Sequence, residues 1–215
     1  MTAGPRWVRQ RLRRGRGSIG VRTSPVRASG NFEALALGIP GPLLIVPRLF
    51  RDARGFFVET WSERELAALG VAERFVQDNH SCSAAAGTVR GMHFQLPPRA
   101  QAKLVRVLRG AVLDVVVDLR RGSPAYGRHA AVELSAADAR QVYVPAGFAH
   151  GFCTLEPGTE VAYKCSDYYD PGLERGLAWD DPDLALPWPV AADRAVLSDK
   201  DRRQPRLRDM APCPD

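Results

Sequence analysis

KLVRVLRGAVLDVVVDL, residues 103–119, consists of two runs of aliphatic and β-branched residues with Arg109 and Gly110 between them. Each run has the length of a β-strand, and a glycine at the junction is typical of a chain reversal. The stretch therefore predicts two strands, over residues 103–108 and 111–119.

Similar short segments continue on both sides of this stretch. The other predicted strands are 56–61, 130–134, 141–144, 151–154 and 160–165, separated by breaks that contain Gly or Pro. One helix is predicted over residues 62–70, with Ser62 as its N-cap and Gly70 at its end. The Pro-, Asp- and Trp-rich stretch after residue 166 predicts an ordered loop with a short helix. Many short strands with almost no helix between them favour an all-β fold, an antiparallel sandwich or barrel.

The composition is that of a globular protein. The chain has 215 residues, of which 45% are hydrophobic and 25% charged, enough for the core of one domain. No apolar run approaches the roughly 20 residues that span a membrane. The four cysteines (82, 153, 165 and 213) show no CxxC spacing and no clustering with histidine. We therefore expect reduced thiols and a cytoplasmic protein, without a disulfide framework or a zinc site.

The net charge of +6 comes from one end of the chain. Residues 1–30 contain eight arginines and no acidic residue, so the remainder is slightly acidic. We expect residues 1–35 to be a basic, disordered N-terminal extension and residues 36–215 to form the folded domain. The extension is compatible with nucleic-acid or anionic-surface binding, with a transit peptide, or with a start codon placed too far upstream. Nucleic acid is not expected to be a partner of the folded domain.

Four histidines, at positions 80, 93, 129 and 150, raise the question of a metal site. Small β-barrels that bind zinc or a transition metal usually offer a His-x-His pair on one strand. Here the positions two residues after His93 and His150 are Gln95 and Phe152, so no metal site is expected. Each histidine taken alone is compatible with a structural role.

Several titratable residues lie on apolar backgrounds. Arg90, His93, Lys103 and Tyr163 would all point into one barrel interior if their segments were strands. Such groups are costly to bury unless they are paired or used. Together they suit proton abstraction beside a carbonyl. A neutral histidine takes the proton, a lysine or backbone donor stabilises the enolate oxygen, and a tyrosine delivers a proton elsewhere.

Longer motifs support a resemblance to a known family. In chain order they are RDARGFFVETW (51–61), FVQDNHS (75–81), VRGMHFQLPP (89–98), QAKLVRVLRGAVLDVVVDLRRGSPAYG (101–127), VYVPAGFAHGF (142–152), YKCSDYYDP (163–171) and LSDKD (197–201). From about residue 38 to about residue 207 the chain resembles the dTDP-4-dehydrorhamnose 3,5-epimerase family. The resemblance implies a double-stranded β-helix, the cupin-type jelly roll, with short peripheral helices. It also implies a homodimer that works without a metal or another cofactor.

The resemblance implies four catalytic residues. His93 matches the general base that removes the protons at C3 and C5 of a 4-keto sugar. Asp201 matches the acid that orients this histidine, although Asp199 is close enough in sequence to be an alternative. Tyr163 matches the acid that reprotonates the opposite face, and Lys103 the lysine that steadies the enolate at O4.

The resemblance further implies a set of substrate-binding residues, some of them acting across the dimer interface. Arg90 matches a diphosphate contact, which suits the bidentate geometry of a guanidinium. Phe56 matches a surface on which the base stacks, and His150 a histidine that lines the sugar pocket. The other implied positions are Arg54, Glu59, Gln77, Asp78, Asn79, Tyr168, Glu174 and Lys200.

The expected function is inversion of C3 and C5 of dTDP-4-keto-6-deoxy-D-glucose. Relatives that invert only one of these carbons, or that isomerise a 3-keto and 4-keto pair, leave alternatives open. A non-catalytic sugar-nucleotide binding module is a further alternative. Such a module would need Arg54, Arg90 and Gln77 but neither Tyr163 nor an Asp201–His93 pair, so the motifs favour an enzyme.

Overall fold

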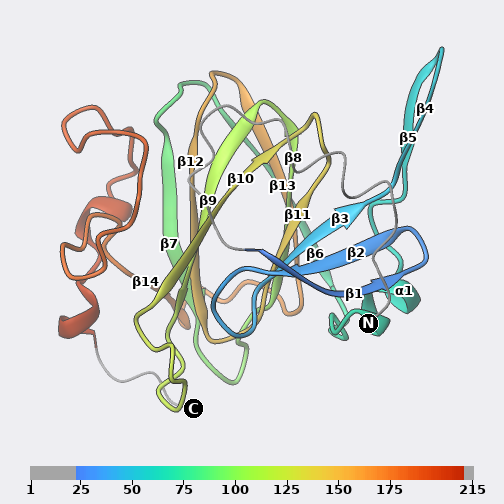
Figure 1. The fold of residues 1–215 in the computed structure, drawn as a ribbon. Coiled ribbons are helices and arrows are strands. Elements are labelled where there is room, and N and C mark those ends of the chain that lie inside the picture. The colour runs from blue at the N-terminus through green and yellow to red at the C-terminus, as the bar shows by residue number, and fades with distance from the viewer. Residues whose placement is uncertain (1–22, 211–215) are drawn as a thin grey trace.

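The computed structural model describes residues 23–210, and its framework is two antiparallel β-sheets that face each other (Figure 1). The seven-stranded sheet has the spatial order β1 (Ser24–Ser29), β2 (Phe32–Ala36), β3 (Leu43–Pro47), β11 (Gln141–Val144), β8 (Lys103–Arg109), β13 (Thr159–Cys165) and β6 (Gln77–Ser83). The five-stranded sheet has the order β10 (His129–Ser135), β9 (Ala111–Asp118), β12 (Phe148–Thr154), β7 (Val89–Gln95) and β14 (Glu174–Gly176). This is a cupin-type jelly roll, and it confirms the predicted fold class.

The stretch at 103–119 connects the two sheets. β8 belongs to the seven-stranded sheet and β9 to the five-stranded sheet, so the chain changes sheets at Gly110. Gly110 has φ +75°, and a Cβ atom there would lie 2.4 Å from Oγ1 of Thr159. Only glycine fits such a junction. The valines of β8 and β9 then meet between the sheets, where Val105, Val112 and Val116 are almost completely buried.

Small elements surround this framework. The helix α1 (Glu63–Ala68) confirms the predicted helix, with Leu66 buried, although the Ser62 side chain makes no capping hydrogen bond. The hairpin of β4 (Leu49–Asp52) and β5 (Gly55–Val58) projects away from the body (Figure 1). The C-terminal segment, with the 3-10 turns η1 (Asp201–Arg203) and η2 (Leu207–Asp209), covers the outer face of the five-stranded sheet. None of the helices within residues 23–210 is long and apolar enough to cross a membrane.

The predicted boundary of the N-terminal extension is wrong for residues 24–35. These residues form β1 and the first part of β2, and β2 pairs with β3 along its whole length. Phe32 and Ala34 pack against Leu66 of α1, which makes β2 part of the core. β2 is only five residues long and directly follows the arginine-rich stretch, so it gave no strand signal of its own in the sequence. Residues 1–22, which hold seven of the eight arginines, lie outside the described residues.

Candidate active site

Titratable side chains from both sheets meet in the interior of the jelly roll. Strands of the two facing sheets contribute the residues Arg90, His93, Lys103, Asp114, His150 and Tyr163. Each of these side chains lies on the strand face that also carries residues of the core between the sheets, or its residue pairs across a ladder with a residue on that face. The predicted polar groups therefore lie on facing strands, although Arg90 is exposed and its guanidinium donates to Oγ of Ser83 and to the carbonyl of Cys82.

His93 forms a short hydrogen bond with a carboxylate that is distant in sequence. Its Nε2 lies 2.6 Å from Oδ1 of Asp201, whose side chain is only 5% exposed. η1 presents Asp201 at this point, and the backbone N–H of Asp201 donates to Oγ of Ser198. Burial raises the pKa of Asp201, but the hydrogen bond and charge of His93, together with Ser198 and Lys200, outweigh it and hold the pKa below its ordinary value. Asp201 is therefore the partner of His93, and it is ionised at neutral pH.

A bulge in β7 places Arg90 and His93 on the same face. Side chains three residues apart on a regular strand point to opposite faces. Here β7 has one residue more than β12 between the pairs Arg90–Phe152 and His93–His150. Gly91 has φ +126°, and a Cβ atom on it would lie 2.5 Å from Cα of Gly151. The glycines at 91 and 151 therefore let the two strands approach closely enough to align the residues of the site.

A second histidine–carboxylate pair lies beside the first. His150 faces His93 across the β7–β12 ladder, and its Nε2 is 2.8 Å from Oδ2 of Asp114. Both residues are buried, and Oδ1 of Asp114 has no hydrogen-bond partner in the described part of the chain. Asp114 was not among the residues predicted for the site. The signal was available, because a carboxylate inside the apolar run AVLDVVVD is costly unless it is paired or used.

Lys103 and Tyr163 enter the interior from the seven-stranded sheet. The Lys103 ammonium donates to the carbonyl oxygen of His93 at 3.2 Å, which links the two sheets. Burial lowers the pKa of Lys103 more than the nearby acidic groups raise it. Burial also raises the pKa of Tyr163 above its ordinary value. At neutral pH Tyr163 therefore carries its proton and can donate it.

The predicted residues on β6 are divided between its two faces. Gln77 and Asn79 face the interior, where Nε2 of Gln77 donates to Oδ1 of Asn79 and Asn79 contacts the thiol of Cys165. Asp78 lies between them and points the other way, paired with Lys164 at 2.9 Å with 64% of its side chain exposed. The structure therefore does not bring Asp78 to the site, because alternate residues of a strand face opposite sides.

Glu174 and Lys200 form an ion pair at the edge of the five-stranded sheet. Their side chains are 2.6 Å apart, and the hydroxyl of Tyr169 donates to the other carboxylate oxygen of Glu174. Burial raises the pKa of Glu174, but these hydrogen bonds and the nearby positive charges outweigh burial, so the pKa lies below its ordinary value. Because Lys200 directly precedes Asp201, the ion pair also fastens the segment that holds the partner of His93.

Three predicted residues lie outside this interior. Arg54, at the tip of the projecting β4–β5 hairpin, pairs with Asp52 at 2.6 Å and is 90% exposed. Phe56 on the same hairpin is 56% exposed. Glu59 accepts a hydrogen bond from the side chain of Asn31 at 2.9 Å. Among residues 23–210 of one chain, none of these three side chains forms a hydrogen bond or ion pair with His93.

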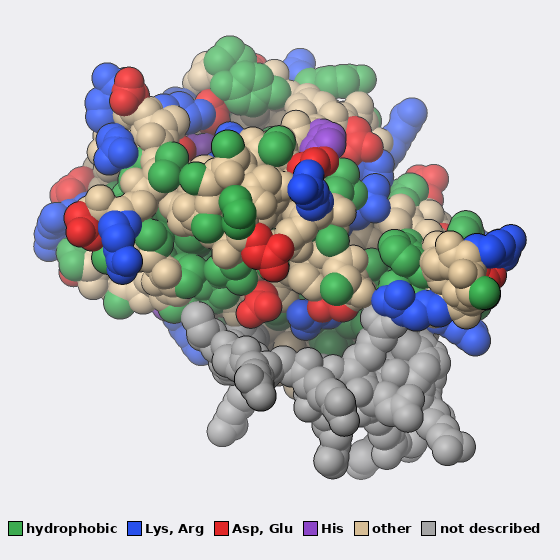
Figure 2. All heavy atoms as spheres, turned by 90° about the horizontal axis from the view of Figure 1, so that it is seen from above, with side chains coloured by type: hydrophobic (Ala, Val, Ile, Leu, Met, Phe, Trp, Pro, Cys, Tyr) green, Lys and Arg blue, Asp and Glu red, His purple; other side chains and the backbone are tan. Residues whose placement is uncertain are grey.

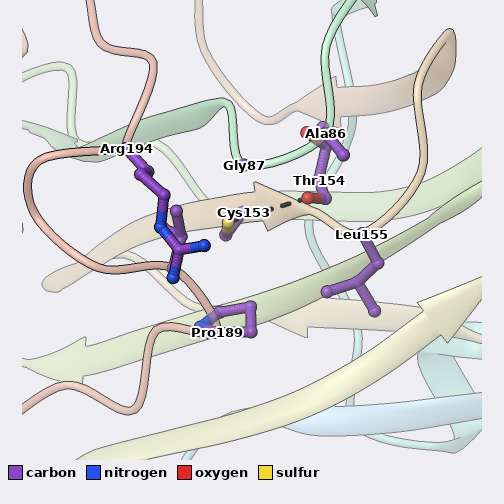
Figure 3. Close-up of a pocket in the computed structure, with 8 residues that line it drawn as sticks. Ala86, Gly87, Cys153, Thr154, Leu155, Pro189 and Arg194 are labelled. Atoms are coloured by element: carbon purple, nitrogen blue, oxygen red, sulfur yellow. Dashed lines mark hydrogen bonds between the residues drawn. The ribbon is translucent and has the colours of Figure 1, made fainter.

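A separate cavity of about 320 Å³ lies at the end of β12 (Figure 3). Its walls include Cys153, Thr154, Val190 and Arg194, and none of the predicted site residues lines it. Burial raises the pKa of Cys153 to about 11, so this thiol is protonated at neutral pH and is a poor nucleophile.

The surface around the fold carries charges of both signs. Seen from above, basic and acidic side chains alternate around the rim with apolar groups between them, and histidine side chains are visible among them (Figure 2).

No group of three or more His, Cys, Asp and Glu residues within 23–210 is arranged to hold a metal ion.

A jelly roll with a histidine–carboxylate pair, a lysine and a tyrosine in its interior defines a cupin-type protein equipped for proton transfer. The family model described as dTDP-4-dehydrorhamnose 3,5-epimerase matches residues 36–209, and the chain belongs to this family.

Individual relatives agree with this assignment. The dTDP-4-dehydrorhamnose 3,5-epimerase of Sinorhizobium fredii is 49% identical over 176 residues, which cover 80% of this chain and 88% of that protein. The crystal structure of the Bacillus anthracis enzyme, with TDP and PPi bound, is 49% identical, with a TM-score of 0.79 over 81% of this chain and 99% of that one. The Legionella pneumophila enzyme, in complex with dTDP-4-keto-L-rhamnose, is 42% identical, with a TM-score of 0.78 over 84% and 95% of the two chains.

Proposed function

We propose that this protein is an isomerase that inverts C3 and C5 of dTDP-4-keto-6-deoxy-D-glucose and yields dTDP-4-keto-L-rhamnose. Family membership supports the reaction class. The observation that carries the assignment to this chain is the position of its groups. The base His93, with its carboxylate partner, lies on one sheet, and the proton donor Tyr163 and the cation Lys103 lie on the facing sheet.

In the proposed mechanism His93 removes the proton next to the C4 carbonyl. Its imidazolium form is stabilised by Asp201, which is already ionised. The electron pair left on carbon moves onto O4, where the ammonium of Lys103 balances the enolate charge. Tyr163 then returns a proton from the opposite side, and the carbon is inverted. The same two groups serve C3 and C5 in turn once the ring has turned over and solvent has taken the proton from His93 and returned one to Tyr163.

We further propose how the nucleotide is held. Arg90 binds the diphosphate, while Gln77, Asn79, His150, Tyr168, Glu174 and Lys200 line the site within the same chain. Arg54, Phe56 and Glu59 lie outside that interior, so we propose that they reach the site of a partner chain in a homodimer. The exposed rings of Phe50, Phe56 and Phe57 on the projecting hairpin support such an interface. The exposed free thiol of Cys82 is in keeping with the reducing cytoplasm.

Deuterium incorporation tests the proposed function. The protein is incubated with dTDP-4-keto-6-deoxy-D-glucose in D₂O, and C3 and C5 are followed by NMR. Deuterium at both carbons, with an L-configured product trapped by a reductase, is the expected result. Label at one carbon alone would establish a mono-epimerase instead. No label at either carbon, with dTDP still bound, would leave a binding module or an enzyme for another sugar.

The pH dependence should identify the cation. Burial lowers the pKa of Lys103 and raises that of Tyr163, so both shifts favour loss of the Lys103 proton before the Tyr163 proton as the pH rises. We therefore expect kcat/KM to fall on the alkaline side at a pH set by Lys103. A Lys103→Arg variant should move this alkaline limb to higher pH, because a guanidinium keeps its proton throughout the working pH range. The measurement is kcat/KM against pH for both proteins, and an unmoved alkaline limb would argue against Lys103.

A further inference from the structure

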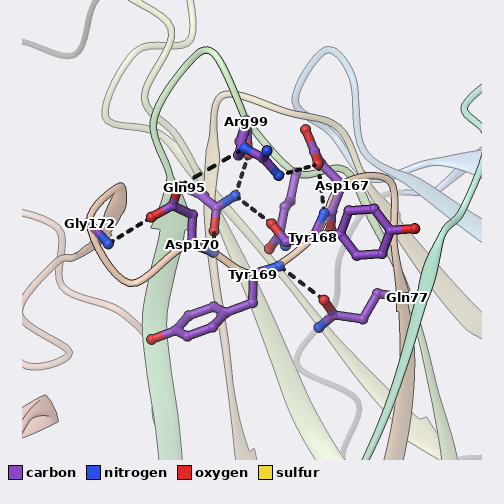
Figure 4. A network of polar contacts seen from close by, with 9 residues as sticks. Gln77, Gln95, Arg99, Asp167, Tyr168, Tyr169, Asp170 and Gly172 are labelled. Carbon is purple, nitrogen blue, oxygen red and sulfur yellow. Dashed lines mark hydrogen bonds and ion pairs between the residues drawn. The ribbon is translucent and has the colours of Figure 1, made fainter.

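Three glutamine side chains hold the segment that links β13 to β14. The carbonyl of Asp167 accepts from Nε2 of Gln101 at 2.8 Å, and the backbone N–H of Tyr169 donates to Oε1 of Gln77 at 2.9 Å. Gln95 makes two further hydrogen bonds to the segment, one with the carbonyl of Tyr168 and one with the N–H of Asp170. Four consecutive residues without regular secondary structure are thus each bonded by a glutamine from another part of the chain (Figure 4).

Gln95 makes the largest contribution. Its Nε2 donates to the carbonyls of Arg99 at 2.5 Å and Tyr168 at 3.0 Å, and its Oε1 accepts from the N–H of Asp170 at 2.9 Å. Both amide hydrogens and the oxygen are therefore used, and the residue is 5% exposed. A buried amide with every group satisfied fixes its partners more firmly than an exposed one, because the alternative is an unpaired polar group.

The segment held in this way presents two tyrosine rings. Tyr168 and Tyr169 are 58% and 53% exposed. Large exposed rings on a rigid backbone suit contact with a planar ligand at little entropic cost. Gln95 lies two residues from His93 on β7, and so on the same face, while Gln77 comes from the opposite sheet. The segment is therefore fixed at the junction of the two sheets, next to the catalytic base.

We propose that Gln95 is a positioning residue for the nucleotide. It fixes the backbone of residues 168–170 so that the Tyr168 ring is set for the pyrimidine nucleoside diphosphate. This inference rests on the proposed function, since it assumes that Tyr168 contacts the dTDP part of the substrate. Gln95 acts through the loop and takes no part in proton transfer.

The test compares binding with turnover in a near-isosteric variant. Gln95→Met keeps the size of the side chain and removes all three hydrogen bonds. We expect the Kd for dTDP, measured by calorimetry, to rise about tenfold, while kcat at saturating substrate changes less than about threefold. In a Tyr168→Ala background the same substitution should cause little further loss of affinity, because the ring that it positions is absent.

A matched control separates positioning from general destabilisation. Thr154 is also buried, and its hydroxyl bonds two backbone groups of the 85–88 turn, away from the loop. Thr154→Val should lower the melting temperature, as Gln95→Met does, and leave the Kd for dTDP unchanged. If Gln95→Met does not fold, Gln101→Met removes only the bond to Asp167 and should weaken dTDP binding in the same direction by a smaller factor.

The outcomes distinguish a failure of the inference about Gln95 from a failure of the proposed function. A folded Gln95→Met protein with the native Kd overturns the inference alone, as does an equal loss of affinity with and without the Tyr168 ring. An unchanged Kd in Gln101→Met overturns it if Gln95→Met cannot be obtained. A native protein that does not bind dTDP refutes the proposed function, and the inference with it.

Discussion

A His93→Ala variant is expected to lose about 10²–10⁴-fold in kcat while it still binds dTDP. The loss follows from the geometry, because no other described group combines a ring nitrogen in this interior with an ionised partner at 2.6 Å. His150 is the nearest alternative and is also paired with a carboxylate, but its side chain is only 7% exposed, against 26% for His93, so a substrate reaches it less easily. Affinity should persist, because the proposed nucleotide contacts lie on other residues. The measurements are single-turnover epimerisation and calorimetric titration with dTDP.

The surface of the same fold offers a matched control for this variant. His80 also pairs with a carboxylate, Glu160 at 3.0 Å, but its side chain is 54% exposed on the outer face of β6. His80→Ala should therefore retain native turnover. The two candidate partners of His93 can be distinguished in the same way. Asp201→Asn should lower kcat severely, whereas Asp199→Asn should not. Native turnover in His93→Ala would rule out the proposed base.

Much of the sheet framework could be predicted from local patterns. The ends of β8, β9, β11 and α1 fall within two residues of the predictions, because each is bounded by glycine or another turn residue or by a capping signal. β12 begins at Phe148, three residues before the predicted start. The early start was hidden by Gly151, which here serves the close approach to Gly91 and does not break the strand.

Other elements depend on contacts that no local pattern contains. β6 has the sequence QDNHSCS, with almost no apolar residue, and is a strand because it pairs along its length with β13. β1 and β2 were assigned to a disordered extension because of their arginine-rich surroundings. In strands, pairing and burial outweigh intrinsic propensity, so polar or short edge strands are the ones that sequence patterns miss.

The site residues likewise include some that local patterns predict and some that depend on contacts between distant parts of the chain. The distance of 108 residues between His93 and Asp201 could be bridged only through the family resemblance, and the structure then distinguished Asp201 from Asp199. Asp78 was included with its neighbours although strand periodicity turns it outward. Gln95 was missed as a site residue because its importance lies in the backbone groups that it holds, which depends on three-dimensional contacts. Asp114 was missed although its position inside an apolar run was a usable signal.

A Tyr163→Phe variant is expected to separate proton removal from inversion. Phenylalanine keeps the packing of the ring against the core and removes only the hydroxyl. His93 can then still take a proton and return it to the same face, so deuterium should enter the unchanged substrate in D₂O. Inversion should fall by about 10²–10⁴-fold, because the hydroxyl that reprotonates the opposite face is gone. His93→Ala, in contrast, should abolish both exchange and inversion.

The control for this experiment is Tyr143→Phe. Tyr143 is buried on the other side of the seven-stranded sheet, where its hydroxyl bonds Glu73 and burial raises its pKa. The same loss of a buried hydroxyl there should lower stability without changing exchange or inversion. If Tyr163→Phe lost exchange together with inversion, Tyr163 would be needed for proton removal as well. If it inverted the sugar at the native rate, the reprotonating acid would have to be another group, and the protonated Lys103 would be the first to test.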